Sequence, residues 1–451
     1  MATTHPPQEP LVAILGTTGT GKSDLAVDLA LKFNGEIINA DAMQMYKGLP
    51  VITNQLSLEE RQGVPHHLLA TVDHHEPTWS VDIFAYEANK LIREIRSRGK
   101  LPIVVGGTHY YLHSLLFKDN LVGSQGIDDT NLQHRPRGEN ETQFQILDGP
   151  TSLMLDRLRE VDPVMADRWH PDDRRKIQRS LEIFLTTGRR ASDIYAEQKQ
   201  EKALARSDSG PWQSLMFWVY TEPEVLNDRL YKRVDKMYQN GLMDEVRSLH
   251  ESRQLRAEKG EPVDLTRGIW QSIGYRQMEP FLDGERAGTG PAKMNQLKEA
   301  GLEETRIATR QYAKYQLRWI RNKSIPAFKD HKAMDYLFLL DSSNADAFSA
   351  DVLEPATDLC QRFLDGQALV KPTEVSDTAK KVLTAFENAG GSSARTFKVK
   401  TCDICGISLA TEDQWNIHIK GRRHHRALRG IKMTALVPLS PQEDHEADIR
   451  I

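Results

Sequence analysis

The chain has 451 residues, of which 39% are hydrophobic and 27% are charged, and its formal net charge is −4. A folded domain holds about 100 to 200 residues, so one small domain is excluded and two to four folded units are expected. The sequence has no run of about 18 apolar residues, which excludes a protein built from membrane-spanning helices. Only three cysteines occur, and the first residues show neither a secretory signal nor a transit-peptide pattern, so we expect a cytosolic protein.

The charge is unevenly distributed along the chain. Residues 395–433 contain nine Lys and Arg against three Asp and Glu, so this stretch is basic while the remainder is acidic. A concentrated basic segment is typical of proteins that bind a polyanion such as a nucleic acid. A segment that only improves solubility would have the same charge, so composition alone leaves both interpretations open.

The first 120 residues alternate between short apolar runs and amphipathic stretches. The predicted elements are a strand at Leu11–Leu15, a helix at Asp24–Phe33, a strand at Glu36–Asn39, a helix at Val81–Arg98 and a strand at Leu101–Val105. Strands that alternate with helices in this way predict a parallel sheet with helices packed on it.

After about residue 121 the sequence becomes polar and glycine-rich, and Thr151–Ala196 then has helical patterns without a strand, which predicts a helical insertion. The α/β pattern resumes with a strand at Trp212–Tyr220, helices at Pro223–Leu249 and Leu297–Asn322, and a last strand at Tyr336–Leu340. Cys360, in the helical stretch Val352–Leu364, is expected to be a buried packing residue. Asp365–Ala394 is polar, as in a linker or a loosely attached helix, and no internal repeat is found.

The segment Gly16–Ser23 reads GTTGTGKS, which matches the P-loop pattern G-x-x-x-x-G-K-[ST] between a predicted strand and a predicted helix. Glycines let the backbone curl so that N–H groups and the helix N-terminus face an anion, and Lys22 adds a positive charge. Ser23 is then placed to bind Mg²⁺. The pattern predicts a diphosphate site, and a glycine turn before a helix is the alternative.

A P-loop enzyme that uses ATP or GTP normally places a metal-binding acid at the end of another apolar strand. Here the strand Leu101–Val105 ends in Gly106-Gly107-Thr108, and the acid instead appears as Asp41, after the strand Glu36–Asn39. Because the carboxyl ends of parallel strands share one edge, Asp41 is expected to face the P-loop as a general base. Helix capping is the alternative for Asp41. It is also the alternative for Thr108, whose hydroxyl is a candidate for contact with a leaving oxygen.

Four candidate metal ligands near the C-terminus have the spacing C-x₂-C-x₁₂-H-x₅-H of a C₂H₂ zinc finger: Cys402, Cys405, His418 and His424. Two thiolates and two imidazoles complete a tetrahedral zinc site, and the segment is too short to fold around a core of its own without the metal. His425 follows His424 directly and remains an alternative fourth ligand. The basic residues of 420–429 favour contact with RNA phosphates, while a finger that binds protein stays open.

Four basic residues recur at every fourth position of a predicted helix: Arg306, Arg310, Lys314 and Arg318. Tyr312, Tyr315 and Trp319 lie on a different face of the same helix. We expect the aromatic face to pack on the protein and the basic face to remain free for RNA phosphates. A solvated basic face without a partner is the alternative.

Five motifs follow one another in a characteristic order: Gly16–Ser23, Asn39–Gln44, Pro65–Leu68, Gly106–Tyr111 and Ser272–Arg276. Together they resemble the tRNA dimethylallyltransferase family, also called tRNA isopentenyltransferases, from about residue 11 to Asn322. The finger is similar to U1/matrin-type fingers and makes the chain resemble the eukaryotic form. The resemblance implies transfer of a dimethylallyl group from dimethylallyl diphosphate to N6 of the adenine 3′-adjacent to the tRNA anticodon, without consumption of ATP.

The resemblance also implies roles for individual residues, with Asp41 as general base and Thr108 in contact with the diphosphate and the reacting region. The residues implied for the prenyl diphosphate are Gly16, Thr17, Thr18, Gly19, Thr20, Gly21, Lys22, Ser23 and Arg233. The candidates for tRNA contact are Asp41, Ala42, Met43, Gln44, Lys176, Gln178, Arg179, Arg310, Gln311 and Lys314. Mg²⁺ would accompany the diphosphate, and Zn²⁺ would be structural.

The predicted fold is therefore α/β: a P-loop NTPase-like parallel sheet flanked by helices, with a helical insertion domain and a small C-terminal zinc finger. The expected boundaries are 1–120 and 211–364 for the catalytic core, 121–210 for the insertion on the tRNA side, 365–397 for a linker, 398–430 for the finger and 431–451 for a tail.

Two other classes of function compete with prenyl transfer to tRNA. A P-loop kinase of a small molecule or nucleoside would use Asp41 to accept a hydroxyl proton, and it would consume ATP. A non-enzymatic RNA-binding protein with a degenerate nucleotide fold is disfavoured by the intact Gly21-Lys22-Ser23 and Asp41. We expect a monomer in the cytoplasm. Mitochondrial and nuclear pools stay open, because members of the family commonly act in more than one compartment.

Overall fold

The computed structural model describes residues 5–76, 78–117, 145–204, 212–261, 263–388 and 397–434. These residues form two compact units. The first contains 5–117 and 212–388, and the second contains 145–204 and 397–434. Parts of the predicted insertion (118–144), linker (389–396) and tail (435–451) lie outside the described residues.

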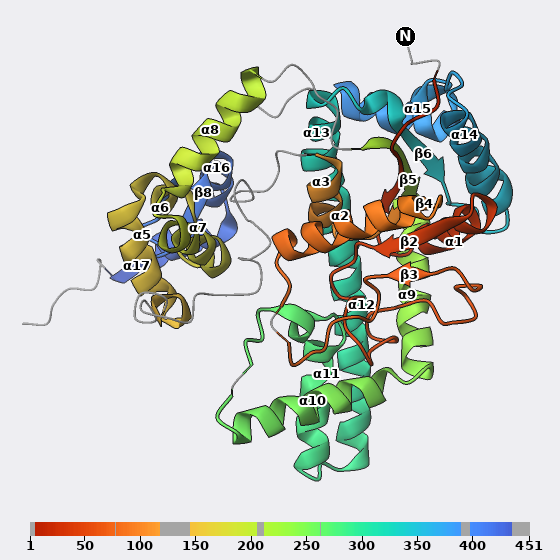
Figure 1. Cartoon of the computed structure of the whole chain (residues 1–451). Helices are drawn as coiled ribbons and strands as arrows, with labels where there is room; N and C mark the ends of the chain where they lie inside the picture. The colour runs from red at the N-terminus through yellow and green to blue at the C-terminus, as the bar shows by residue number, and fades with distance from the viewer. Residues whose placement is uncertain are drawn as a thin grey trace, which may run out of the picture. The chain divides into compact units, whose positions relative to one another are not determined.

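The first unit is built on a parallel sheet, which has six strands among the described residues, in the order β3-β2-β4-β1-β5-β6 (Figure 1). The strands are β1 (Pro10–Gly16), β2 (Gly35–Asn39), β3 (His66–His67), β4 (Leu101–Val105), β5 (Gln213–Tyr220) and β6 (Leu337–Asp341). Every pair of neighbours is parallel. The predicted fold class is confirmed, and of the strands of this sheet the two-residue β3 was not predicted.

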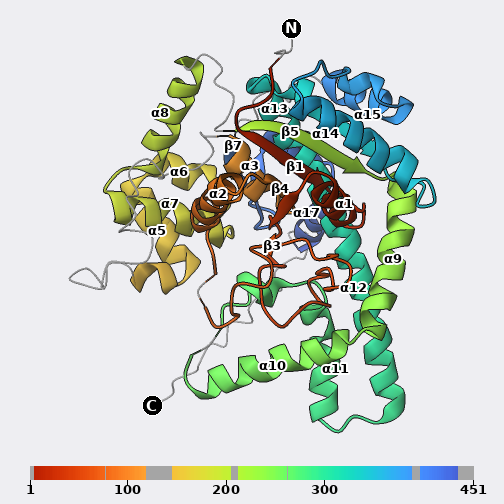
Figure 2. The ribbon, with the colours of Figure 1, turned by 45° about the vertical axis from the view of Figure 1, so that its right-hand side comes forward.

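The sheet strands are continuous apolar runs because helices cover both faces of the sheet. On one face, α1 (Lys22–Lys32) and α14 (Glu354–Leu364) pack against side chains that include Ile14 and Phe217. On the other face lie α2 (Val81–Ser97) and α3 (His109–Leu116) (Figure 2). These helices pack in a larger cluster that includes Trp218. Phe217 and Trp218 are neighbours in β5 and point to opposite faces, as the two-residue period of a strand requires.

The second half of the first unit is mainly helical. Its helices are α9 (Pro223–Gln239), α10 (Leu242–Glu258), α11 (Tyr275–Arg286), α12 (Pro291–Trp319) and α13 (Ile325–Asp330), with a π-helical turn at Ile320–Ser324. The prediction of one helix over Pro223–Leu249 is wrong. The helix ends at Asn240-Gly241, where Gly241 has φ of 100°, a left-handed conformation that glycine adopts at little cost.

The stretch predicted as a linker is partly folded. Within it, α15 (Asp377–Asn388) places Ala379 and Leu383 in the main hydrophobic cluster. The alternative of a helix is therefore the correct one for these residues, and this helix packs on the core. Cys360 of α14 is fully buried, as predicted, and burial raises the pKa of its thiol to about 12. A π-helical turn at Ser349–Leu353 precedes α14, and short 3₁₀ turns lie at Gly268–Gln271, Met334–Tyr336 and Pro372–Glu374.

The second unit contains the helical insertion and the zinc-finger segment. After a 3₁₀ turn at Gln145–Asp148, the insertion has α5 (Thr151–Val161), α6 (Pro163–Arg168), α7 (Arg174–Thr187) and α8 (Ala191–Leu204). The finger segment has the antiparallel strands β7 (Phe397–Thr401) and β8 (Ser408–Thr411), followed by α16 (Glu412–Ile419) and α17 (Arg422–Thr434). Across both units, the helices in the described ranges are too short or too polar to cross a bilayer.

A buried ion cluster joins β2 to its neighbours. Glu36 is only 3% exposed, and its carboxylate accepts from Arg98 at 2.6 Å, from His67 at 2.7 Å and from Lys100 at 2.9 Å. Burial alone would raise the pKa of Glu36, but the three hydrogen bonds lower it from its ordinary 4.5 to about 2. A carboxylate whose pKa is lower in the folded state stabilises the fold fully above its unfolded pKa, and this contribution fades as the pH falls toward 2.

We therefore expect Glu36→Gln to lower the free energy of unfolding at pH 7 by about 2 kcal/mol. Urea unfolding at pH 7 and at pH 3.5 measures the effect, and the difference from wild type should be smaller at the lower pH. Glu94→Gln, at an exposed position of α2, is the matched control. An equal loss of stability at both values of pH would show that charge at Glu36 is not the cause.

Candidate active site

The P-loop connects β1 to α1 and supplies a turn of backbone N–H groups around the start of the helix. Gly21 forms the N-cap of α1 with φ of 86°, which only glycine adopts without strain. Within the loop, the carbonyl oxygen of Thr17 accepts from the hydroxyl of Thr20 at 3.0 Å and from Nζ of Lys22 at 2.6 Å. Burial lowers the pKa of Lys22 to about 8, although the charge of Asp41 opposes that shift.

Asp41 lies at the carboxyl end of β2, in a turn fixed by its own neighbours. The side chain of Asn39 accepts from the Asp41 N–H at 3.1 Å and donates to the Asp41 carbonyl at 3.0 Å. The Asp41 carboxylate accepts from the N–H of Met43 at 3.1 Å. Turns rather than a helix follow Asp41 in the described residues 42–65, so the helix-cap interpretation is wrong. Burial raises the pKa of Asp41, against opposing hydrogen bonds and the charge of Lys22.

The loop Gly106–Thr108, hereafter the GGT loop, lies against the turn that carries Asp41. A Cβ atom at Gly106 would come within 2.1 Å of the Ala40 carbonyl oxygen, so only glycine fits there. The hydroxyl of Thr108 accepts from the N–H of Ala42 at 3.0 Å, and the Thr108 N–H donates to the Ala40 carbonyl at 3.2 Å. Thr108 is the N-cap residue of α3, but its side chain makes no capping hydrogen bond. The Thr108 hydroxyl thus connects the GGT loop to the turn that carries Asp41.

The two arginines of α9 have different surroundings. Arg233 donates to the hydroxyl of Thr18 in the P-loop at 2.5 Å. Burial lowers the pKa of Arg233, and the charges of Asp24 and Asp41 oppose the shift. Arg229, one turn earlier, instead donates to the backbone carbonyls that follow β6, of which the nearer is 2.6 Å away. Arg233 is therefore the arginine of this helix that reaches the P-loop.

The predicted buried face of α12 is confirmed only in part, because Tyr312 and Trp319 are partly buried but Tyr315 is exposed. The buried residues of the helix are Gly301, Leu302, Thr305, Thr309, Ala313 and Gln316. Tyr315, which was expected to pack, is 53% exposed. Arg306, which was expected to be free, lies over the ring of Tyr231 and pairs with Asp235 at 2.5 Å. The basic face that remains accessible consists of Lys314 and Arg318, with Arg310 partly exposed 3.7 Å from Glu303.

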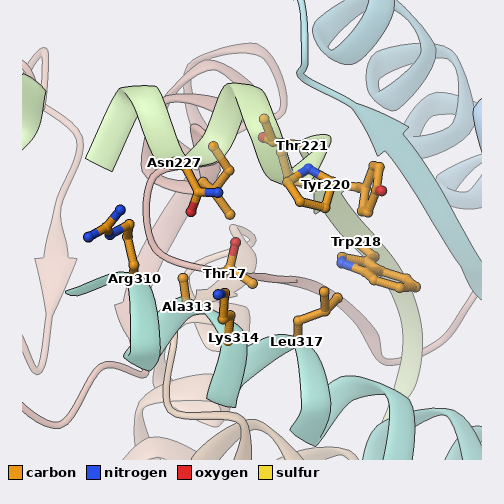
Figure 3. A pocket seen from close by; sticks show the side chains of 12 residues that line it. Thr17, Trp218, Tyr220, Thr221, Asn227, Arg310, Ala313, Lys314 and Leu317 are labelled. Atoms are coloured by element: carbon orange, nitrogen blue, oxygen red, sulfur yellow. The ribbon is translucent and has the colours of Figure 1, made fainter. Parts of the chain in front are cut away.

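A cavity of about 50 Å³ lies on another side of α12 (Figure 3). Its walls come from the end of β5, the start of α9 and the helix itself, with Trp218, Leu226 and Leu317 among its apolar lining residues. Thr17 of the P-loop also lines it, as do the side chains of Arg310 and Lys314. Figure 3 shows Thr17 and Lys314 among the side chains that line the cavity. The lining does not include Asp41.

The remaining candidates for tRNA contact differ in exposure. Gln311 is exposed, whereas Ala42, Met43 and Gln44 are partly buried. The side-chain amide of Gln44 donates to the Asn54 carbonyl at 2.8 Å, which holds this segment in place.

On α7 of the second unit, Lys176 and Arg179 have accessible side chains that pair with Asp173 and Glu182. Gln178 is 6% exposed and donates to the Leu147 carbonyl at 3.0 Å. In this conformation Gln178 supports the insertion from inside rather than offering a surface to RNA.

One residue at the site was not found from the sequence. Gln316 is buried at 2% exposure, and its amide contacts both the P-loop and the GGT loop. The signal that could have identified it is its spacing, because it follows Thr309 by seven residues and Thr305 by eleven, on the buried face of α12.

The four predicted zinc ligands come together in the finger segment. One ligand atom from each of the four residues lies within 4.8 Å of the others: Cys402, Cys405, His418 and His424. The Nδ1 atom of His424 is 3.6 Å from each sulfur. His424 is buried while His425 is exposed, which favours His424 as the fourth ligand. Two sulfurs and two imidazole nitrogens are a donor set that suits zinc.

Comparison with known families and proteins agrees with this geometry. Residues 44–323 match the model of the IPP transferases, and residues 400–424 match the model of C2H2-type zinc fingers. The chain is 38% identical to the tRNA dimethylallyltransferase of Schizosaccharomyces pombe, over 95% of this chain and 96% of that one. It is 34% identical to the human tRNA dimethylallyltransferase, over 93% of this chain and 86% of that one.

A solved structure gives the same answer for the fold. The crystal structure of a eukaryotic dimethylallyltransferase acting on tRNA superposes with a TM-score of 0.76 and 32% identity, over 95% of this chain and 98% of that one. The matched family model covers more than half of the chain, and the relatives match over nearly their whole length. The chain therefore belongs to the IPP transferase family, the tRNA dimethylallyltransferases, and carries a C2H2-type zinc finger near its C-terminus.

Proposed function

We propose that this chain transfers the dimethylallyl group of dimethylallyl diphosphate to N6 of the adenine 3′-adjacent to the anticodon in tRNA. The observation that carries the proposal is the location of Asp41. A partly buried carboxylate whose pKa is raised stands near the P-loop lysine, at the carboxyl end of β2. Such a group is suited to accept a proton from a substrate that attacks a P-loop-bound diphosphate.

The P-loop binds the diphosphate of the donor. Backbone N–H groups at the start of α1, the ammonium of Lys22 and the guanidinium of Arg233 surround the place where negative charge develops as the diphosphate leaves. A Mg²⁺ ion bound with the diphosphate would supply further positive charge. Ser23, in the first turn of α1, offers the hydroxyl oxygen that such an ion accepts as a ligand, so the residues present fit the ion.

The acceptor, N6 of adenine, is a weak nucleophile because the lone pair of an exocyclic amine is delocalised into the purine ring. Correct positioning of N6 against the donor must therefore supply part of the rate enhancement. The N6 lone pair forms a bond to C1 of the dimethylallyl group. The C1–O bond breaks and its electron pair leaves with the diphosphate. The proton that N6 loses goes to the carboxylate of Asp41. The hydroxyl of Thr108, in the neighbouring GGT loop, would donate a hydrogen bond to a substrate oxygen. The base must leave the anticodon stack to reach this site, at a cost of a few kcal/mol.

We further propose which surfaces contact the RNA. Ala42, Met43 and Gln44 continue directly from Asp41 and would meet the extruded base. Gln311 and Lys314 on α12 are accessible for the anticodon loop, with Arg310 partly so. In the second unit, Lys176, Arg179 and the α17 residues Arg422, Arg423 and Arg426 are exposed and suited to phosphates. Gln178 is left out because it is buried.

One chain is proposed to be sufficient for the reaction, because the P-loop, Asp41, the GGT loop and Arg233 all belong to the first unit. This supports a monomer, and sedimentation at working concentrations tests it. The thiolates of Cys402 and Cys405 need a reducing compartment to bind zinc, which supports a cytoplasmic enzyme. Cell fractionation tests that part of the proposal.

The decisive experiment offers the purified protein two labelled donors in parallel. Unmodified tRNA is incubated with either dimethylallyl diphosphate labelled in the prenyl group or ATP labelled in the γ-phosphate. We expect the prenyl label to appear in tRNA at the adenine after the anticodon, with stoichiometric release of diphosphate and no phosphate transfer. Label transferred only from ATP would replace the proposed activity with that of a kinase.

The zinc finger gives a separate prediction. Cys402→Ser removes one of two thiolate ligands, so the finger should lose zinc and its fold. We expect the KM for tRNA to rise about 10-fold at physiological salt, because the basic residues near the last ligand lose their arrangement, while kcat at saturating tRNA stays within about twofold. Zinc content and steady-state kinetics measure both effects.

His425→Asn is the control for that variant, since His425 is exposed and stands outside the ligand cluster. It should retain one zinc per chain and the wild-type KM. A Cys402→Ser enzyme with unchanged KM for tRNA would exclude a role of the finger in binding RNA and would favour a protein partner.

A further inference from the structure

The buried side chain of Gln316 connects the P-loop to the GGT loop. The oxygen Oε1 of Gln316 accepts from the N–H of Thr18 in the P-loop at 2.8 Å. The nitrogen Nε2 of Gln316 donates to the carbonyl of Gly107 in the GGT loop at 3.0 Å. Gln316 lies within α12, far from both loops in the sequence, and is only 2% exposed. Bulk water therefore does not compete with the protein for the hydrogen bonds of this amide.

The contact continues from the GGT loop to the catalytic carboxylate. The backbone of Gly107 is hydrogen-bonded to Asp41, and this bond opposes the upward shift that burial imposes on the pKa of Asp41. A Cβ atom at Gly107 would lie 2.5 Å from Nε2 of Gln316 and 3.1 Å from Oδ2 of Asp41, so a larger residue there would displace the Gln316 amide. Gln316 thus holds the carbonyl of Gly107, the same residue whose backbone N–H donates to Asp41.

A second side chain of the same helix supports the amide. Tyr312 lies one turn before Gln316 and is hydrogen-bonded to it. Burial raises the pKa of its phenol, and the nearby charge of Asp41 acts in the same direction. Both residues lie toward the loops, whereas Arg310, Lys314 and Leu317 lie toward the cavity. The helix therefore has one side for the reacting groups and another for the cavity.

We propose that Gln316 is a positioning residue that sets the distance between the donor's diphosphate and the general base. The inference rests on the proposed function and names a residue through which it is achieved. The P-loop determines where C1 of the dimethylallyl group lies, and Asp41 determines where N6 lies. A primary amide can accept from one loop and donate to the other, so a single Gln side chain holds both.

Two substitutions separate this role from simple packing. Gln316→Met keeps the length and volume of the side chain but removes both hydrogen bonds. Gln316→Glu keeps an acceptor for Thr18 but cannot donate to Gly107, and it places a negative charge near Asp41. A negative neighbour raises the pKa of a carboxylate, so the acid limb of the pH profile for kcat should move to higher pH by about one unit.

The expected result for Gln316→Met is a fall of about 100-fold in kcat, since a displacement on the order of 1 Å between reacting groups can have that effect. The KM for tRNA should stay within about threefold, because Gln316 does not lie on the RNA surface. Gln296→Met, at an exposed position of the same helix, is the matched control and should behave as wild type. Thermal unfolding of all variants shows whether the fold is retained.

The outcomes decide the inference in either direction. A kcat of Gln316→Met within threefold of wild type would overturn it. So would an unmoved acid limb in Gln316→Glu together with a large loss of thermal stability in both variants, because that combination describes a packing residue. Failure of the wild-type enzyme to prenylate tRNA in the same assay would instead overturn the proposed function, so the two failures are distinguishable.

Discussion

Replacement of Asp41 by Asn should lower the rate of dimethylallyl transfer at saturating substrates by about 10³-fold, within the range by which general bases accelerate proton transfer. The amide oxygen of Asn can still accept from the Met43 N–H, so the turn should keep its shape. What is lost is the basic oxygen. We therefore expect tRNA affinity within about threefold of wild type, measured by filter binding with the diphosphate donor absent.

The pH dependence of the same variant provides a second measurement. Burial raises the pKa of Asp41, so the carboxylate becomes protonated at a higher pH than an exposed aspartate would. The wild-type rate should fall as the pH drops through that pKa, because the protonated form cannot accept the N6 proton. The Asp41→Asn enzyme has no such group and its residual rate should lack this acid limb.

Asp28→Asn is the control for charge and helix effects, since Asp28 lies in α1 and burial also raises its pKa. It should retain the wild-type rate and pH profile. An Asp41→Asn enzyme that keeps more than a tenth of the wild-type rate would exclude Asp41 as the base. One that loses tRNA binding instead of turnover would assign Asp41 a structural role.

The sheet could be predicted from the sequence because its strands are signalled locally. Strands such as β1 and β4 are continuous apolar runs followed by glycines, and a strand buried on both faces requires such runs. The strand β3 carries no such signal, since His66 and His67 pair with β2 through a contact made only in the fold. Asn240-Gly241 is a signal for the break between α9 and α10. The helical pattern on both sides of it nevertheless led to the prediction of one continuous helix.

The site was predictable where its residues belong to a contiguous motif. The P-loop and the GGT loop are each specified within a few residues, and their meeting with Asp41 follows from the order of parallel strands. The residues from α9 and α12 were harder, because their roles depend on how each helix is rotated about its axis. Arg229 and Arg233 are equivalent in a helical pattern, yet only Arg233 reaches the P-loop.

The rotation of α12 shows the same limitation most clearly. The aromatic residues suggested one buried face, but only Tyr312 and Trp319 are partly buried, and Tyr315 is exposed. The helix buries Thr305, Thr309 and Gln316 more deeply. Two of these buried groups are threonines that bond back to the carbonyl four residues earlier, which satisfies their hydroxyls without any distant partner. Only Gln316 needs partners from elsewhere, and these are known only once the loops are in place.

The second large effect is expected at Lys22. Burial lowers the pKa of its ammonium to about 8, with Arg233 acting in the same direction and Asp41 opposing. In the free enzyme the ammonium therefore loses its proton as the pH rises through about 8, and the attraction for the diphosphate is lost with it. We expect kcat/KM for dimethylallyl diphosphate to fall above pH 8. By contrast, kcat should be less affected, because the bound diphosphate stabilises the protonated form.

Lys22→Met removes the charge while keeping most of the side-chain volume, so it should lower kcat/KM for the donor by about 10³-fold and abolish the alkaline limb. Lys32→Met, at the exposed end of α1, is the matched control and should preserve both the value and the limb. A wild-type kcat/KM that is constant from pH 7 to about 9.5 would mean that the buried ammonium stays charged before the donor arrives. A Lys22→Met enzyme within tenfold of wild type would mean that the backbone N–H groups and Arg233 alone hold the departing diphosphate.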